Sequence, residues 1–295
     1  MTTSSRSLAS TLYPIGLLLI AMATIQSGAS LAKELFPIVG AQGATALRLL
    51  FSSILLLAIF KPWRSQWTAR SLRNILFYGL ALGLMNLLYY LAIRTVPLGI
   101  AVALEFTGPL AVAIFSSRRA IDFVWIALAV VGLVLLMPAM DSPASIDPVG
   151  MAYALGAGAC WAAYIIFGKK AGDDHGVQGA VLGVVVAAIF VVPVGFAHAG
   201  SAMLSWSLLP IALGVAILST AIPYTLEMVA LTRMPARTFS ILMSIEPVAG
   251  ALAGFLFLSE ILTLTQWLAI VAIIAASVGT TLTSQKEPAT TLAAD

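Results

Sequence analysis

The sequence predicts an all-α membrane protein of ten transmembrane helices, arranged as two inverted five-helix repeats. The first observation is composition: 61% of the 295 residues are hydrophobic and 9% are charged, and the mean hydropathy is +1.04. A soluble domain carries about 25% charged residues, so this chain is suited to lipid. The second observation is a series of apolar runs of roughly 20 residues, the length that crosses a bilayer. The third is a sequence match between the two halves.

Polar residues, prolines and glycines separate the apolar runs, and the connections between them are short. The expected helices are 12–32, 43–60, 75–93, 98–115, 123–140, 149–168, 177–197, 208–228, 239–258 and 265–282. The first run is long for a signal-peptide core and lacks a small-x-small cleavage site, so it is expected to remain as a transmembrane helix. Connections this short leave no room for a soluble catalytic domain.

Lysine and arginine predict the orientation, because cytoplasmic loops of membrane proteins carry an excess of both. With the N-terminus inside, the inner segments hold most of these residues and the outer loops hold only Lys33 and Arg94. Both termini are therefore expected in the cytoplasm. The single cysteine, Cys160, lies within an apolar run and excludes an intrachain disulfide.

Short runs of the first half recur in the second half at nearly one offset, 136 or 138 residues later. The matching pairs include Lys33 and Lys169, Gly40 and Gly176, Gln42 and Gln178, Pro97 and Pro235, and Pro109 and Pro247. Because five is odd, the second copy enters the membrane in the opposite direction. We therefore expect a first five-helix repeat over 12–140 and an inverted copy over 149–283. Repeats of this kind build secondary transporters, with the substrate near the bilayer midplane.

Two glutamates lie inside these apolar runs, each beside a helix breaker. Glu105 precedes Gly108 and Pro109, and Glu246 directly precedes Pro247. A carboxylate at membrane depth costs about 2.5–3.5 kcal/mol on insertion scales, which marks both as candidate functional residues. A glutamate away from water can exchange a proton near neutral pH, or, when ionised, hold a ligand ammonium group. The alternative is a protonated or ion-paired glutamate that joins two helices.

Two further charges fall within the runs. Arg48 has the fork geometry that grips a carboxylate; the alternatives are a structural salt bridge to one of the glutamates or snorkelling to the outer surface. Glu227 is expected near the cytoplasmic end of its helix, paired with Arg233 or Arg237, and the alternative is a role at the bilayer midplane.

Polar and aromatic side chains on the first, third, sixth and eighth runs are expected to line a cavity between the halves. They are Gln26, Asn86, Tyr90, Trp161, Tyr164 and Tyr224, with Ser27, Ser30 and Tyr89 beside them. Each alone more often serves helix packing. No nucleotide-binding, zinc-protease or nucleophile-elbow motif is present, so neither an enzyme nor a cofactor is expected. His175 and His198 lack a second ligand at metal spacing.

Taken together, these features resemble the drug/metabolite transporter superfamily, with its two EamA-type repeats. The runs 94–119 and 217–237, and Leu-Gly-Ala-Gly-Ala-Cys-Trp at 155–161, are similar to the threonine/homoserine exporters of that superfamily, and the likeness extends over about 12–283. The resemblance implies a bacterial inner-membrane protein that exports threonine, homoserine and related small amino acids by proton antiport with alternating access.

Three alternatives remain at this point. The first is a transporter of the same fold with another cargo, such as a purine, an aromatic amino acid or a cationic compound. The second is a membrane-embedded enzyme acting on lipid, which would need a clustered nucleophile, metal site or acidic motif that the sequence does not offer. The third is a membrane sensor or assembly partner without flux. The expected partners are the amino acid, protons and the bilayer, with no nucleic acid and an undefined oligomeric state.

Overall fold

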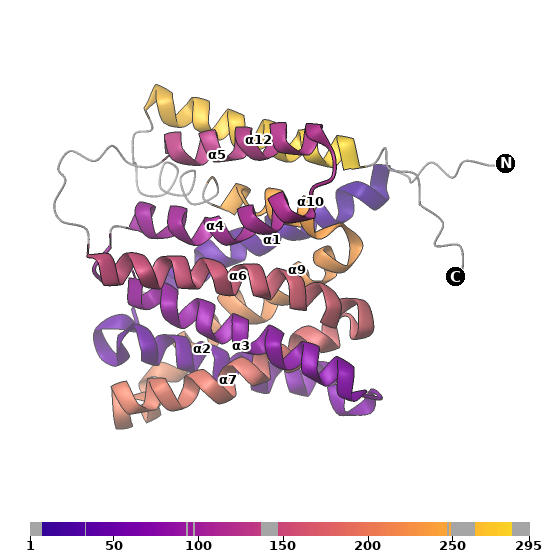
Figure 1. Ribbon diagram of the computed structural model, residues 1–295. Coiled ribbons are helices and arrows are strands. Elements are labelled where there is room, and N and C mark those ends of the chain that lie inside the picture. The colour runs from indigo at the N-terminus through magenta and orange to yellow at the C-terminus, as the bar shows by residue number, and fades with distance from the viewer. Residues whose placement is uncertain are drawn as a thin grey trace.

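The computed structural model describes residues 8–32, 34–92, 94–96, 98–136, 147–246, 248 and 263–284. Every regular element in these residues is a helix, and they contain no strand (Figure 1). The predicted all-α class is therefore confirmed for this part of the chain. The ends of the fifth and ninth predicted helices, 137–140 and 249–258, lie outside the described residues, as do Lys33, Pro97 and Pro247.

The α-helices lie side by side along one common direction (Figure 1). They are α1 (Leu8–Ala32), α2 (Phe36–Phe60), α3 (Ala69–Ala92), α4 (Leu98–Ser116), α5 (Ala120–Leu136), α6 (Pro148–His175), α7 (Val177–Ala199), α8 (Leu209–Ala216), α9 (Ile222–Arg233), α10 (Ala236–Leu242) and α12 (Leu264–Ser284). Short 3₁₀ turns occur at η1 (Pro62–Arg64), η2 (Gly200–Leu204) and η3 (Trp206–Leu208), and η4 (Ile217–Ala221) is a π-helical turn.

Five helical stretches are long and apolar enough to cross a bilayer. They are Phe36–Phe60, Ala69–Ala92, Pro148–His175, Val177–Leu204 and Trp206–Arg233. Shorter apolar helices cover Leu12–Ile25, Leu104–Ser116, Ala120–Leu135 and Leu264–Thr280. The described residues therefore contain a helix for each predicted run, although the ninth run is described only at its start. The count of ten spans stays a prediction.

The span that leads to α9 is interrupted, where the sequence predicts one continuous helix. Pro223 has no N–H, so the carbonyl four residues earlier, at Ser219, lacks its usual donor. The chain accommodates this with the π turn η4, in which the Ile222 N–H reaches back to the Ile217 carbonyl. π turns inside α-helices are frequent at functional sites. Two candidate residues, Tyr224 and Glu227, follow directly on α9.

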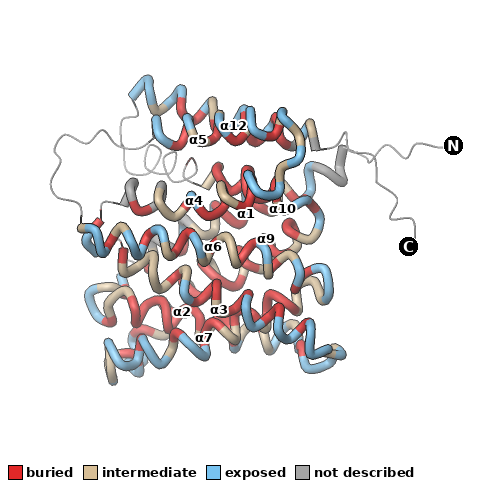
Figure 2. Tube along the Cα trace, in the orientation of Figure 1, coloured by how far each residue is buried: buried red, intermediate tan, exposed pale blue. Residues whose placement is uncertain are grey.

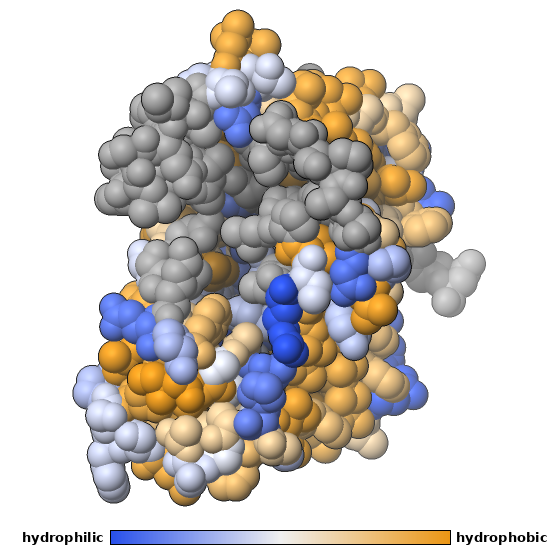
Figure 3. Space-filling model, turned by 90° about the vertical axis from the view of Figure 1, so that its left-hand side faces the viewer, coloured by the Kyte–Doolittle hydropathy of each residue, from blue (hydrophilic) through white to orange (hydrophobic). Residues whose placement is uncertain are grey.

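The bundle has a buried interior and an apolar outside. Figure 2 shows buried residues where helices face one another and exposed residues on the outward faces of α5 and α12. Side chains such as Val131, Val134 and Val271 are more than half exposed, as expected for contact with lipid. Viewed from one end, polar side chains gather among apolar ones (Figure 3).

The two halves begin at opposite ends of this bundle. α1 begins at the end where α12 finishes, and α6 begins at the other end (Figure 1). Between them, α4 and α6 approach closely at two glycines. A Cβ on Gly158 would lie 2.6 Å from the Glu105 carbonyl oxygen, and a Cβ on Gly108 would overlap the Gly158 backbone. Only residues without a side chain permit this crossing.

Candidate functional site

Arg48 is a buried cation without an ion pair among the described residues. Its side chain is 7% exposed, donates to Asn86 Oδ1 and lies 5.6 Å from the centre of the Tyr90 ring. Its Nε has no hydrogen-bond partner. Arg48 is therefore not snorkelled to the surface, and it is bridged to none of the glutamates that the structure describes. A buried guanidinium with a free donor is complementary to a ligand carboxylate.

Asn86, which accepts the hydrogen bond from Arg48, is itself hydrogen-bonded to Tyr224. The Asn86 side-chain amide donates to the Leu82 carbonyl at 2.8 Å and to the Tyr224 hydroxyl at 3.1 Å. Asn86 lies on α3 and Tyr224 on α9, and they are 138 residues apart, the separation that relates Pro97 to Pro235. Two residues that the predicted repeat makes equivalent thus contact each other.

Glu105 and Glu246 lie near enough for their charges to interact, and both charges act on Tyr89. Both glutamates are half-buried, and neither forms an ion pair within the described residues. Pro109 lacks an N–H, so the Glu105 carbonyl has no helical donor four residues on. The α4 backbone is therefore open at the turn that carries this carboxylate, and the close approach of Gly158 holds that turn against α6.

Glu227 is not where the sequence-based expectation put it. It is 3% exposed and accepts a hydrogen bond from the Tyr164 hydroxyl at 2.7 Å. The expected partners are engaged elsewhere: Arg233 lies 4.7 Å from the Tyr13 ring centre, and Arg237 forms an ion pair with Asp122 at 2.8 Å. The pairing of Glu227 with an arginine was therefore wrong. Glu227 follows Tyr224 by three residues, so the two share one helical face. Because Tyr224 was already a candidate cavity residue, this spacing was the sequence signal that Glu227 points inward.

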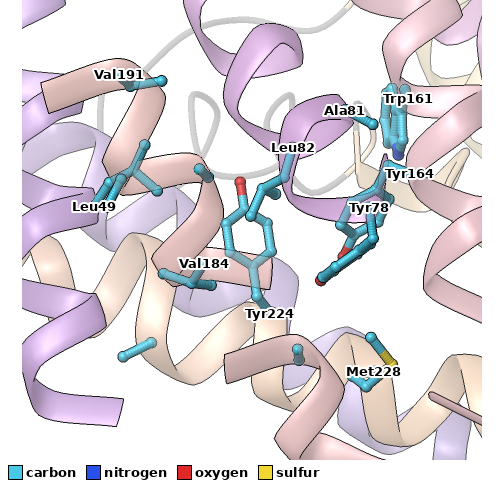
Figure 4. Close-up of a cluster of buried hydrophobic side chains, with 14 of the residues drawn as sticks. Leu49, Tyr78, Ala81, Leu82, Trp161, Tyr164, Val184, Val191, Tyr224 and Met228 are labelled. Atoms are coloured by element: carbon cyan, nitrogen blue, oxygen red, sulfur yellow. The ribbon is translucent and has the colours of Figure 1, made fainter. Parts of the chain in front are cut away.

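Tyr164 belongs to a cluster of three buried tyrosines on different helices. Its ring centre lies 5.1 Å from that of Tyr78 on α3 and 6.0 Å from that of Tyr224 on α9. Figure 4 shows Tyr78 and Tyr164 next to each other, with Tyr224 nearby. Tyr78 was not among the candidates, because one tyrosine in an apolar run carries no distinguishing pattern.

The remaining candidates lie on the expected helices. Trp161 is 8% exposed and meets Phe106 edge to face at 6.2 Å. Tyr90 also meets Phe36 edge to face at 5.7 Å. Gln26 lies on α1, but its side chain is outside the described part.

The charges form one arrangement around Tyr224. Arg48, Glu227 and Glu246 all act electrostatically on this tyrosine, from α2, α9 and the segment after α10. One cation and two carboxylates thus act on the same tyrosine, a combination that matches a small molecule carrying both an anionic and a cationic group. No group of three metal-ligating side chains occurs in the described residues. A separate cavity of about 290 Å³ near Leu47 and Trp206 is mostly apolar and includes none of these residues.

Comparison with known proteins gives strong matches. Residues 148–282 match the model of the EamA-like transporter family. The chain is 59% identical over 275 residues to the "Threonine/homoserine exporter RhtA" of Salmonella typhimurium (strain SL1344), covering 93% of each chain. It is 58% identical over 274 residues to the protein of that name from Escherichia coli (strain K12), again covering 93% of each.

Two further matches are more distant. The "Uncharacterized transporter YwfM" of Bacillus subtilis (strain 168) is 32% identical over 155 residues, half of each chain. A solved structure described as "Crystal structure of protein" superposes with a TM-score of 0.73 over 94% of this chain and 99% of that one. At 17% identity, this likeness shows the fold alone.

Proposed function

We propose that this chain, which belongs to the RhtA family of threonine/homoserine exporters, carries threonine, homoserine and related small amino acids out of the bacterial cytoplasm. It is a multi-pass membrane protein, and its sequence relatives are named as transporters. Beyond family membership, we propose a substrate-binding site, a membrane topology and the ion that drives transport.

The site is assigned from the pairing of opposite charges. The observation that carries this assignment is Arg48, a buried guanidinium whose Nε has no partner among the described residues. Its charge acts on Tyr224, as does that of Glu246, and the charge of Glu246 also acts on Glu105. An amino acid presents a carboxylate and an ammonium group a few ångströms apart. In our proposal the carboxylate binds Arg48, the ammonium binds between the two glutamates, and Tyr90, Trp161 and Tyr224 surround the side chain.

The topology consists of ten spans in two inverted repeats, over 12–140 and 149–283, with both termini in the cytoplasm. The opposite starting ends of α1 and α6 support it. The Asn86–Tyr224 hydrogen bond also supports it, because equivalent residues of two halves meet where a pseudo-twofold axis passes between them. Alternating access then occurs by rocking of the halves around this contact.

The coupling ion is the proton. Glu105 and Glu246 repel each other when both are ionised, so a proton or a substrate ammonium relieves the same repulsion. The two ligands therefore compete for the site, which is the requirement for antiport.

The test is counterflow of labelled threonine in proteoliposomes that contain the purified chain, with a pH jump as the second variable. Saturable exchange with unlabelled threonine or homoserine, accelerated by an inward proton gradient, is the expected result. Absence of exchange for both amino acids in a folded preparation would contradict the proposed cargo. A screen of purines, aromatic amino acids and cationic compounds would then follow.

A further inference from the structure

We propose that Glu227 is a proton-binding group of the transport cycle, held in place by Tyr164 and lying between the substrate site and the cytoplasmic end of α9. This inference rests on the proposed proton antiport and adds a residue that does not touch the substrate. Tyr164 acts as a positioning residue.

The first argument is the environment of Glu227. The carboxyl is buried on α9 and receives one hydrogen bond, from the Tyr164 hydroxyl at 2.7 Å. The charge of Glu246 acts on Glu227, and the charge of Glu227 acts on Tyr78, Tyr164 and Tyr224. None of these described groups is a cation. An ionised carboxylate buried without a cation is costly, and binding a proton removes that cost.

The described cations on the helices packed against α9 are engaged with other groups, and Arg48 on α2, which donates to Asn86, forms no ion pair with Glu227 within the described residues. Lys169 on α6 pairs with Asp173 at 3.0 Å and donates to the Thr232 carbonyl at 3.2 Å. Arg233, at the end of α9, lies over the Tyr13 ring of α1, and Arg237 on α10 pairs with Asp122. The described part of α7, which also packs against α9, has His198 as its only titratable group, at its far end from Gly176. Proton binding is therefore the means by which Glu227 becomes neutral.

The second argument is the position of Glu227 relative to the substrate site. It lies one turn after Tyr224 on α9, and the charge of Glu246 acts on both residues. In the other direction, Arg233 ends α9 six residues later, roughly 9 Å along the axis. Glu227 thus lies one helical turn from Tyr224 of the proposed substrate site and about two turns from the proposed cytoplasmic end of α9.

These positions give a proton step whose charge balances. With Glu246 ionised and the site empty, repulsion between the carboxylates favours the protonated acid at Glu227. When the substrate ammonium neutralises Glu246, that repulsion falls, and the O–H of Glu227 releases its proton to water at the cytoplasmic end, leaving a carboxylate. Substrate release to the outside restores the negative charge on Glu246, and the Glu227 carboxylate then takes up one proton from the outer medium, so one proton enters for each substrate that leaves.

The first experiment separates exchange from coupling, with Glu227→Gln compared with the surface control Asp173→Asn. Threonine counterflow at equal pH is expected to continue in both variants, because exchange needs no net proton transfer. With one unit of pH gradient and one proton per substrate, the wild type and Asp173→Asn sustain up to about tenfold accumulation. Glu227→Gln is expected to sustain none, and wild-type accumulation by this variant would overturn the proposal.

The second experiment needs no substrate, so it decides the role of Glu227 even if threonine is not the cargo. Infrared difference spectra of the purified protein in lipid nanodiscs are recorded during a pH titration. A carboxylic-acid C=O band that titrates in the wild type should be missing in Glu227→Gln and present in Asp173→Asn. An unchanged set of titrating bands in Glu227→Gln would refute the assignment.

Tyr164→Phe tests the positioning role. Losing the hydroxyl removes a donor that stabilises the ionised carboxylate, so the pH dependence of coupled flux should move toward alkaline pH. A purely structural role would lower the amount of folded protein without moving this profile. An unmoved profile would therefore refute the role of Tyr164.

Discussion

Glu105 is placed by the residues that follow it. Pro109 leaves its backbone carbonyl without a helical donor, and the glycine contact at Gly158 holds that turn against α6. The side chain remains half-buried, with the charge of Glu246 nearby. A residue held in this way is suited to alternating between a proton and an ammonium group.

We expect Glu105→Gln to abolish coupled threonine export and to leave membrane insertion intact, because the amide keeps the shape of the side chain and cannot exchange a proton. Export from cells and the amount of protein in the membrane fraction are the measurements. Glu34→Gln, at an exposed position beyond α1, is the matched control and should export normally. Normal export by Glu105→Gln would refute its assigned role.

Arg48 makes a different prediction, because it binds without exchanging a proton. Arg48→Lys keeps the charge and loses the fork, so the half-saturating concentration of threonine should rise. A hydrogen bond to a charged group is worth about 1.5–3 kcal/mol, which corresponds to roughly 10- to 150-fold. Concentration-dependent counterflow measures this, with the exposed Arg70→Lys as control. An unchanged half-saturating concentration would exclude carboxylate binding at Arg48.

At the scale of elements, a buried ion pair joins α5 to α10. Arg237 Nη1 lies 2.8 Å from Asp122 Oδ2, and the two side chains are 6% and 2% exposed. The side chain of Arg119, which directly precedes α5, donates to the Thr283 carbonyl at the end of α12. These contacts tie three helices together at one end of the bundle.

Removing one partner of this pair should be strongly destabilising, since the other charge stays buried. Asp122→Asn is expected to cost about 3–5 kcal/mol. The matched control is Asp173→Asn, which breaks an exposed pair with Lys169 and should cost only about 0.3–0.5 kcal/mol. Thermal unfolding in detergent compares the two, and equal melting temperatures would contradict a structural role for the buried pair.

The start of α6 gives a prediction about pH. The Thr95 hydroxyl, followed by the backbone N–H groups of Val149 and Gly150, holds the pKa of Asp147 below its usual range. A lowered pKa in the folded state adds stability above the unfolded value, about 3.9, and this stability is lost as the pH falls through the folded value.

Asp147→Asn should therefore melt below the wild type at neutral pH and approach it as the pH falls below about 4. The asparagine side chain can still cap the start of α6 but carries no charge. The stability of the variant therefore lacks the pH dependence that comes from ionisation of Asp147. Parallel melting curves of the wild type and variant at every pH would contradict the effect.

At the scale of the whole molecule, the proposed orientation can be tested because Cys160 is the single cysteine. In a Cys160→Ser background, Ser205→Cys lies in the exposed segment after α7 and Gln66→Cys in the exposed segment after α2. A membrane-impermeant thiol reagent should label Ser205→Cys in intact cells and Gln66→Cys only after the membrane is opened. The reverse pattern would invert the proposed topology.

Much of the molecule could be predicted without coordinates. Charge-poor apolar runs predict helices, because a backbone in lipid must satisfy its hydrogen bonds internally. Intramembrane charges predict candidate residues, because their insertion is costly. Glu105, Glu246 and Arg48 are candidates by that argument alone, and their roles stay predictions. The family likeness of the chain follows from runs such as 155–161.

The tertiary structure decided which charges are partners. In a helix that is apolar all round, the sequence period does not define which face turns inward or how deep a residue lies. The burial of Glu227 against Tyr164, the pairing of Arg237 with Asp122 and the free Nε of Arg48 depend on that rotation and depth. Contacts between helices come from packing, so the sequence alone predicted the candidate charges, and the fold determined their partners.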